Sequence, residues 1–324
     1  MKNYVQQLEI RNFKSIRHLS LSGFKKINLF IGRPNVGKSN ILEALSVFSV
    51  PLLGVKSGPL PLKKIQQLIR VENEPELFHN GEILEKVIIN VNDSRCSFSY
   101  KRTIKEMEDW HNPVNEKKGI FFDFSLETDI SIKCYHFKTN TKFKPNNSYY
   151  LSVPFGENIL QVLEPLPRLR AIFTHWFEQY GLRLVLDKAS GSLKVMKDKG
   201  KEVFIIPYSL IADTLQRIIF YKTAVASNDH SVLIFEEPEA HAFPPYIAEF
   251  TQEVINSDTN QFFIATHSPL IVNDFLENAR QDLAIFIVDF KGGQTIVKSL
   301  TDDELYGVYK YGVDLFFNNE AYLV

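Results

Sequence analysis

Cysteine is scarce in this chain, with only Cys96 and Cys134 among 324 residues. The two lie in unrelated segments and lack the spacing of metal ligands, so we expect buried free thiols rather than a disulfide framework or a zinc site. Long apolar runs are also missing. No stretch approaches the ~20 residues that cross a bilayer, and residues 1–7 lack the core of a secretory signal. We therefore expect a cytoplasmic protein with no membrane partner.

Net charge is nearly absent as well. The 37 basic and 38 acidic residues leave a formal charge of −1, so no global field draws the protein to nucleic acid. The lysine pairs are scattered along the chain, and we interpret each as part of a solvent-exposed surface. They are Lys25 with Lys26, Lys63 with Lys64, and Lys117 with Lys118. A DNA partner thus stays open, without support from charge. No heptad pattern or internal repeat is present, which argues against a long coiled-coil arm.

The chain does contain a phosphate-binding loop in a fitting context. The apolar run 27–31 predicts a buried strand, and helical spacing predicts a helix from Lys38 to about Val50 that Pro51 ends. Glycines let backbone amides approach phosphate oxygens, Lys38 would meet the β- and γ-phosphates, and the Ser39 hydroxyl would bind Mg²⁺. The residues predicted to hold a nucleotide are Gly32, Arg33, Pro34, Asn35, Val36, Gly37, Lys38, Ser39 and Asn40.

Two later strands also end in polar side chains. The apolar strand 232–235 delivers Glu236 and Glu237 to its end. Adjacent buried carboxylates are costly unless a cation offsets them. We therefore assign Glu236 to the metal, and Glu237 to orienting or deprotonating the attacking water. The strand 261–265 precedes His267, which could donate to the γ-phosphate. The predicted catalytic residues are thus Glu237, His267 and Lys38.

Three apolar strands are each followed by polar or charged residues that could act on a nucleotide. This pattern predicts an α/β protein with its site at the C-terminal edge of a parallel sheet. We expect a nucleotide-binding core in 1–50 and 205–324, split by an inserted β-rich and helical lobe, 51–204. Other expected strands are 5–10, 16–21, 87–91, 95–102, 130–137, 182–186, 193–196, 283–289 and 295–299. Expected helices are 157–180, broken by prolines, then 210–226, 244–255 and 302–310, and 138–148 is expected to be an exposed loop.

Together the motifs resemble those of ABC-type ATPases of the chromosome-maintenance (SMC) and RecF kind, and most of all the overcoming-lysogenization-defect (OLD) branch. The similar strings are Ile10-Arg11-Asn12-Phe13-Lys14-Ser15-Ile16, Gly37-Lys38-Ser39-Asn40-Ile41-Leu42-Glu43-Ala44-Leu45, Glu236-Glu237-Pro238-Glu239-Ala240-His241 and Thr266-His267-Ser268-Pro269. This resemblance covers about 1–50 and 205–290. It implies a P-loop NTPase fold of the ABC ATPase-head type with ATP and Mg²⁺ as cofactors. It also implies that Arg11 and Asn12 join the nucleotide-binding residues.

The resemblance further implies a homodimer in which each phosphate loop faces the partner's signature segment, so that ATP holds the heads together. The chain departs from the family pattern here, because 208–217 contains no glycine and Ala212-Asp213-Thr214 stands in place of Ser-Asp-Gly. We expect this change to slow turnover. Residues left with two interpretations are Ser209, Asp213 and Arg217 (dimer contact or surface helix) and His241 (neighbouring site or helix cap); Gln66 and Gln67 are candidates for the sensor glutamine.

The leading hypothesis for function is an ATP-driven dimerising switch. The resemblance implies a separate nuclease or toxin partner in bacterial antiphage defence, because the chain ends soon after the last predicted hairpin and we expect no TOPRIM nuclease domain within it. Two alternatives stay open. One is a RecF-like clamp that closes on DNA, and the other is a catalytically weak ATP-binding scaffold.

Overall fold

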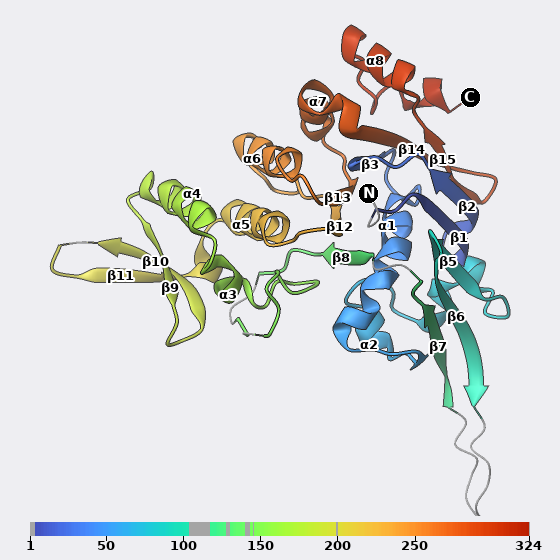
Figure 1. Cartoon of the computed structure of the whole chain (residues 1–324), viewed down its shortest axis with the longest axis horizontal. Coiled ribbons are helices and arrows are strands. Elements are labelled where there is room, and N and C mark those ends of the chain that lie inside the picture. Colours follow the sequence, from blue (N-terminus) through green and yellow to red (C-terminus); the bar gives the residue numbers. More distant parts are fainter. Residues whose placement is uncertain are drawn as a thin grey trace, which may run out of the picture.

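Two six-stranded sheets form the framework of the molecule (Figure 1). The computed structural model describes residues 4–103, 117–127, 130–139, 143–144, 146–198 and 200–323. The core sheet has the order β15-β14-β3-β13-β12-β8 and is parallel except for β15. Its strands are β3 (Ile27–Ile31), β8 (Ser131–Tyr135), β12 (Ser231–Glu236), β13 (Gln261–Ala265), β14 (Leu283–Lys291) and β15 (Gln294–Ser299). The expected α/β class is confirmed.

Both faces of the core sheet are buried, which explains why its strands are apolar throughout rather than alternating. Val232 and Ile234 of β12 enter one hydrophobic core with α1, while Leu233 and Phe235 enter another with α5, α6 and α7. Figure 1 shows α1 on one side of this sheet and the other three helices on the opposite side. The helices are α1 (Lys38–Ser46), α5 (Asp213–Ala226), α6 (Pro244–Ile255), α7 (Pro269–Asn278) and α8 (Asp302–Tyr311).

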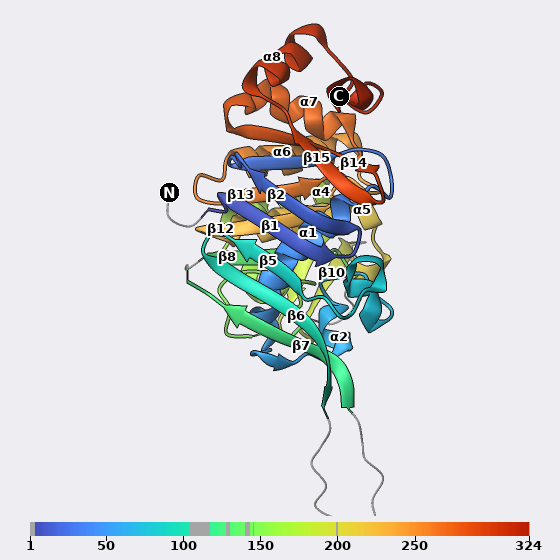
Figure 2. The same ribbon diagram turned by 90° about the vertical axis from the view of Figure 1, so that its right-hand side faces the viewer.

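The second sheet is antiparallel, has the order β2-β1-β5-β6-β7-β4, and covers α1 on the side away from the core sheet. Figure 2 looks onto this sheet. Its strands are β1 (Gln7–Phe13), β2 (Ile16–Ser22), β4 (Gly58–Pro59), β5 (Val87–Val91), β6 (Ser94–Thr103) and β7 (Lys117–Ser125). The short helix α2 (Leu62–Ile65) lies in the segment between β4 and β5. Helix α1 is therefore enclosed between two sheets.

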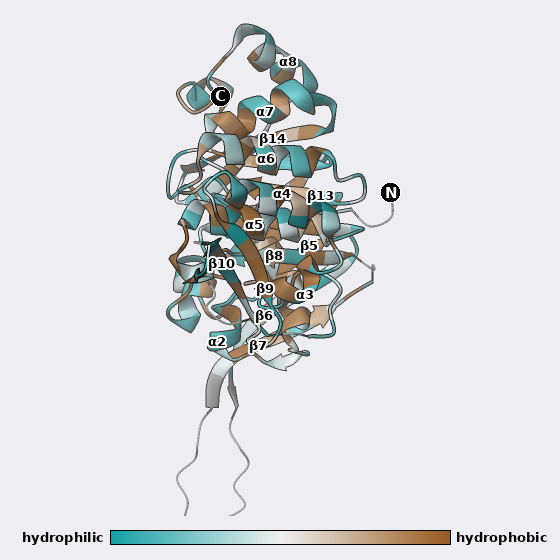
Figure 3. Cartoon of the chain, turned by 90° about the vertical axis from the view of Figure 1, so that its left-hand side faces the viewer, coloured by the Kyte–Doolittle hydropathy of each residue, from teal (hydrophilic) through white to brown (hydrophobic). Residues whose placement is uncertain are grey.

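A smaller three-stranded sheet, β11-β10-β9, projects beside α4 and α5. Its strands are β9 (Arg183–Asp187), β10 (Ser192–Asp198) and β11 (Val203–Pro207). The helices α3 (Ile159–Leu163) and α4 (Pro167–Glu178) precede it in the chain. Figure 3 shows hydrophilic residues on the outward sides of α6, α7 and α8, as expected for helices that cover a sheet. Among the described residues, no helix has the length and apolarity needed to span a membrane.

Several expectations about elements need correction. Pro51 does not end the first helix. Instead α1 stops at Ser46 and continues as a 3₁₀ helix, Val47–Leu53, that includes Pro51. Helix α5 begins at Asp213 rather than near 210, because Tyr208–Leu210 forms a separate 3₁₀ turn. Helix α7 and strands β7 and β11 were not expected. Both cysteines are buried free thiols, as predicted.

The division into 1–50 plus 205–324 and an inserted lobe stays a prediction. Strand pairing shows that the middle of the chain shares both large sheets with the outer parts, because β8 borders β12 and β5 borders β1. The expected loop 138–148 includes residues 140–142 and 145, which lie outside the described part of the chain, as do the side chains of Lys117 and Lys118.

Candidate functional site

The phosphate loop follows β3 and wraps around the Lys38 side chain. The Lys38 ammonium donates hydrogen bonds to the carbonyl oxygens of Gly32 (3.0 Å) and Arg33 (2.8 Å). Gly32, Asn35 and Gly37 have positive φ values of 147°, 61° and 104°. This backbone reverses sharply around one buried cation, as a loop that wraps a phosphate group requires.

The two glycines of the loop are also required because β14 and β15 pack against it. A Cβ atom on Gly32 would lie 2.2 Å from the carbonyl oxygen of Val288, and a Cβ on Gly37 would lie 2.0 Å from the Thr295 hydroxyl. Thr295 also donates to the carbonyl of Val36 (2.9 Å) and contacts the Ser15 hydroxyl (2.6 Å). The sequence analysis missed this support, because Thr295 carries no local motif.

The carboxylates of the second motif reach the start of α1. The Ser39 hydroxyl donates to Oε1 of Glu236, across 197 positions of sequence. The other oxygen, Oε2, lies 2.5 Å from the Arg70 guanidinium. The structure thus brings together the two regions on which the nucleotide-site prediction depends.

Ser39 and Glu236 together fit a magnesium ion. One hydroxyl and one carboxylate, completed by phosphate oxygens and water, are the hard oxygen donors that Mg²⁺ usually takes. Within the described ranges, no group of three or more His, Cys, Asp or Glu side chains could hold a metal by itself. Ser39 and Glu236 thus supply two of the oxygen ligands that such an ion would need.

Burial shapes the charge of the loop lysine. Lys38 is only 5% exposed, and burial lowers the pKa of its ammonium to about 8, although Glu237 and Glu236 act in the opposite direction. Nearby carboxylates thus offset part of the desolvation penalty, and phosphate oxygens would offset more.

This pKa leads to a pH prediction for nucleotide binding. If phosphate requires the ammonium form, the apparent dissociation constant for ATP should rise about tenfold per pH unit above pH 8, since the ammonium fraction falls tenfold per unit there. Titration calorimetry between pH 7 and 9.5 measures this. The Lys38→Ala variant should show a flat profile over the same range, and an equally flat wild-type profile would contradict the prediction.

Glu237 and His267 face each other beyond the phosphate loop. His267 Nε2 lies 3.7 Å from Glu237 Oε1, and the two side chains are 35% and 47% exposed. Burial, and then the Lys38 charge, lower the pKa of His267, so the neutral imidazole is favoured. Glu237 has a positive φ of 43°, and its amide donates to the Ala265 carbonyl (2.8 Å). The predicted catalytic residues therefore share one partly open site.

Comparison with known proteins identifies the family. A family model described as an AAA ATPase domain matches residues 4–206, more than half of the chain. The chain belongs to this family. A second model, described as an AAA domain, putative AbiEii toxin of a type IV toxin–antitoxin system, matches residues 164–273.

Two curated relatives match this chain over short stretches. An "ATP/GTP phosphatase" of Helicobacter pylori is 46% identical over 41 residues, which is 13% of this chain and 11% of that protein. An uncharacterized Methanocaldococcus jannaschii protein is 43% identical over 54 residues, 17% of this chain and 23% of its own length. The chain thus spans under a quarter of either relative.

A solved structure has the same fold as this chain. An SMC head bound to the C-terminal winged-helix domain of ScpA aligns with a TM-score of 0.54 at 16% identity. The alignment covers 92% of this chain and 98% of that one. The expected resemblance to an SMC-type ATPase head is confirmed at the level of fold.

The sequence analysis did not predict a network of hydrogen bonds and charges that joins Lys14, Glu43 and Arg70. Lys14 donates to Glu43 Oε2 (2.5 Å) and to the Arg70 carbonyl (2.6 Å), and the Arg70 amide donates to Glu43 Oε1 (2.9 Å). Burial raises the pKa of the Glu43 carboxyl, and Lys14 opposes this. The network fixes the backbone of Arg70, whose guanidinium reaches Glu236. Lys14 and Glu43 lie within motif strings, but nothing around Arg70 in the sequence indicates its role.

Some predicted nucleotide-binding residues have other partners. The Asn12 amide donates to the Glu85 carbonyl (3.0 Å) and its oxygen accepts from the His79 amide (3.2 Å), while Arg11 pairs with Glu9. The contacts of Arg11 and Asn12 thus place neither at the phosphate loop, and their nucleotide role stays a prediction.

Within the loop segment the side chains also differ in placement. Asn40 donates to the Ser15 hydroxyl (2.6 Å), which fixes the β1–β2 turn to α1. Arg33, Pro34 and Asn35 are exposed, and Arg33 pairs with Glu320. Val36 is buried in the core beside α1. These contacts describe the loop without a nucleotide, and the binding role predicted for its residues stays a prediction.

The signature region lies at the start of α5. Asp213 and Arg217 form an ion pair one helical turn apart (2.6 Å), and the Arg217 guanidinium lies 4.6 Å from the Phe137 ring centre. Ala212 is the N-cap residue, without a side-chain cap. Internal contacts thus account for Asp213 and Arg217, and a role across a dimer stays a prediction for them and for Ser209.

The remaining candidates are His241 and the two glutamines, Gln66 and Gln67. His241 does not cap α6, because Phe243 is the N-cap residue, so the helix-cap interpretation is wrong for this helix. Gln66 donates to the Val71 carbonyl (3.0 Å), and the assignment of a sensor to Gln66 or Gln67 stays open.

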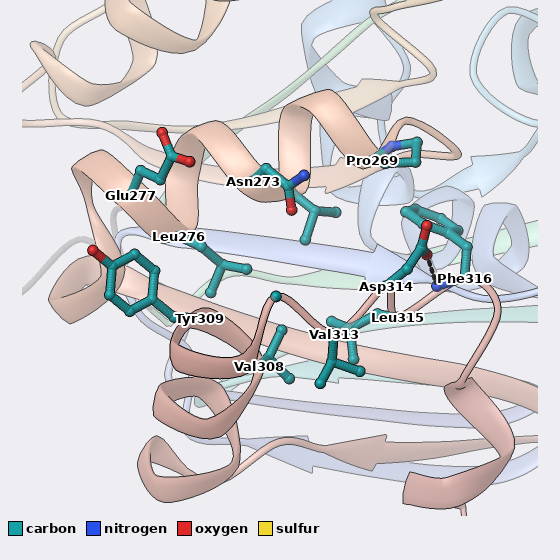
Figure 4. A pocket seen from close by; sticks show the side chains of 12 residues that line it. Pro269, Asn273, Leu276, Glu277, Val308, Tyr309, Val313, Asp314, Leu315 and Phe316 are labelled. Atoms are coloured by element: carbon teal, nitrogen blue, oxygen red, sulfur yellow. Dashed lines mark hydrogen bonds between the residues drawn. The ribbon is translucent and has the colours of Figure 1, made fainter.

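A cavity of about 290 Å³ lies between α7 and α8 (Figure 4). Its lining includes the apolar side chains of Val272, Leu276 and Val308. Figure 4 shows Glu277 and Tyr309 at one side of it. None of the predicted site residues lines this cavity. The candidate site is therefore the phosphate loop with its carboxylates, not the cavity.

Proposed function

We propose that this chain is a Mg²⁺-dependent ATPase head that works as a nucleotide-gated dimerising switch. The observation that carries the proposal is the contact of the Ser39 hydroxyl with Glu236, next to the buried Lys38 ammonium. Membership of the AAA ATPase family and the SMC-head fold support it.

In the proposed reaction each residue acts on a defined part of the nucleotide. Loop amides and the Lys38 ammonium hold the β- and γ-phosphates, and Glu237 orients a water and accepts its proton. His267, favoured as a neutral imidazole, donates a hydrogen bond to the γ-phosphate. Ser39 and Glu236 would hold Mg²⁺, which would supply positive charge to offset the charge of the phosphate oxygens.

Arg70 adds a specific feature to this proposal. Its guanidinium neutralises Glu236 Oε2 in this structure, where Glu236 is 9% exposed and Arg70 is 69% exposed. The long exposed side chain can leave that carboxylate for a phosphate oxygen without unfolding its backbone, which Glu43 and Lys14 hold.

The proposed output of the switch is assembly with other chains. A homodimer closed by ATP, membership of the OLD branch and a separate nuclease or toxin partner in antiphage defence form one consistent proposal. The family model that names a putative AbiEii toxin supports the defence setting. The glycine-free signature, whose Asp213 and Arg217 pair internally, favours slow turnover.

Phosphate release from ATP by the purified chain tests the catalytic part. We expect release that needs Mg²⁺ and that falls about tenfold or more in Ser39→Ala, because that variant loses a metal ligand. Exposed Lys63 provides a control, and Lys63→Ala should match the wild type. Equal release with and without Mg²⁺ would count against the proposal, and no release at all would favour the ATP-binding scaffold.

A further inference from the structure

One carboxylate near the site is not used by the proposed reaction. Glu239 lies three positions after Glu236, in the turn that follows β12. Its Oε1 accepts hydrogen bonds from the Thr266 hydroxyl (2.7 Å) and from the backbone amide of His267 (2.7 Å). Both donors belong to the loop that follows β13, so Glu239 joins the two loops that carry the predicted catalytic pair.

The second oxygen of Glu239 gives an independent sign of constraint. Within the described part of the chain, Oε2 is buried without a hydrogen-bond partner. A buried polar atom without a hydrogen-bond partner lowers stability, and this carboxylate is held in place by the two hydrogen bonds of its other oxygen. Burial also raises the pKa of this carboxyl. A carboxyl group at this position therefore carries a cost in burial, and its Oε1 is the atom that joins the two loops.

The backbone around Glu239 is shaped to direct this side chain. Glu237 and His241 have positive φ values of 43° and 58°, and two turns close through Ala240 N to Glu237 O (3.0 Å) and Ala242 N to Glu239 O (2.8 Å). Positive φ costs energy for residues other than glycine. Together with the amide of Glu237 on Ala265, three hydrogen bonds fix the acidic turn to the histidine loop.

We propose that Glu239 is a positioning residue that sets the spacing between the Glu237 carboxylate and the His267 imidazole. It acts through the His267 backbone and touches no nucleotide. This inference rests on the proposed function, because it matters only if Glu237 and His267 act on the γ-phosphate. Its effect should therefore fall on the chemical step and spare ATP affinity.

The test compares Glu239→Ala with Glu239→Gln. Alanine removes the acceptor, whereas the glutamine amide oxygen can still accept both hydrogen bonds. We expect Glu239→Ala to lower kcat by about 10- to 100-fold, as small misplacements of catalytic groups do, with ATP affinity within about threefold. Glu239→Gln should stay within about threefold of the wild type. Glu277→Ala, on an exposed face of α7, is the matched control.

Two further measurements separate positioning from general destabilisation. In a His267→Ala background, Glu239→Ala should lower kcat by less than about twofold, because the group that it positions is gone. The proton NMR signal of the His267 ring, identified by its loss in His267→Ala, should shift in Glu239→Ala and not in Glu239→Gln. Thr266→Val removes one donor to Glu239 and should give a smaller loss of kcat.

The outcomes distinguish this inference from the function beneath it. If His267→Ala lowers kcat but Glu239→Ala does not, the positioning role is wrong while the proposed ATPase stands. If His267→Ala leaves kcat unchanged, the histidine role fails and the positioning role fails with it. Loss of kcat in Glu239→Gln equal to that in Glu239→Ala would also overturn the inference.

Discussion

Replacing Lys38 by alanine should weaken ATP binding by about 10²- to 10⁴-fold. Its ammonium is held by the carbonyls of Gly32 and Arg33 at the centre of the loop, where it would meet two phosphates. Each hydrogen bond to a charged group contributes about 1.5–3 kcal/mol, and 1.4 kcal/mol corresponds to tenfold in affinity. Titration calorimetry at pH 7 measures the change.

A lysine outside the phosphate loop provides the control for Lys38→Ala. Lys63 is exposed on α2, and Lys63→Ala should bind ATP like the wild type. Thermal unfolding of the ligand-free Lys38→Ala protein shows whether the loop still folds. Unchanged ATP affinity in a folded Lys38→Ala protein would reject the phosphate-loop assignment, and with it every role assigned around the loop.

The parts of the site that the sequence predicted are those defined by local pattern and sheet geometry. The loop after β3 can be located from its glycines, lysine and serine, and the carboxylates from their position at the end of an apolar strand. Parallel strands align their carboxyl ends at one edge. The meeting of Ser39 with Glu236 therefore followed from topology, without any knowledge of side-chain contacts.

The residues that sequence analysis missed depend on tertiary packing instead. Arg70 reaches Glu236 only because Glu43 and Lys14 hold its backbone from other elements. Thr295 supports the loop from the far end of the chain, and β8 joins the core sheet from within the middle segment. Asn12 shows what a motif leaves out, because its side chain forms hydrogen bonds with the Glu85 carbonyl and the His79 amide, and its predicted nucleotide role stays a prediction.

The contrast between local sequence pattern and tertiary packing also explains why the end of α1 and the presence of α7 differed from expectation. Proline at position 51 breaks the α-helical hydrogen bonding but is compatible with the 3₁₀ turn that continues from α1. Helix α7 starts at Pro269 directly after the histidine loop, and its apolar residues lie on the face that covers the core sheet.

Replacing Glu237 by glutamine should block the chemical step while leaving ATP bound. The amide is nearly the size of the carboxylate but cannot accept the proton of the attacking water. Single-turnover cleavage should therefore fall by about 10²- to 10⁴-fold, with ATP affinity within about threefold. Quenched-flow measurement of phosphate from bound ATP reports the chemical step, and Glu277→Gln on α7 is the control.

The same variant tests the switch, because it separates binding from cleavage. If ATP holds two heads together, Glu237→Gln with ATP and Mg²⁺ should accumulate a species with twice the mass of one chain in light scattering, since the ligand that stabilises the dimer is no longer consumed. Glu237→Gln combined with Lys38→Ala should stay at the mass of one chain. A folded, ATP-bound Glu237→Gln protein of single-chain mass would mean that nucleotide binding does not close a dimer, and the glycine-free segment 208–217 would then explain why the heads fail to engage.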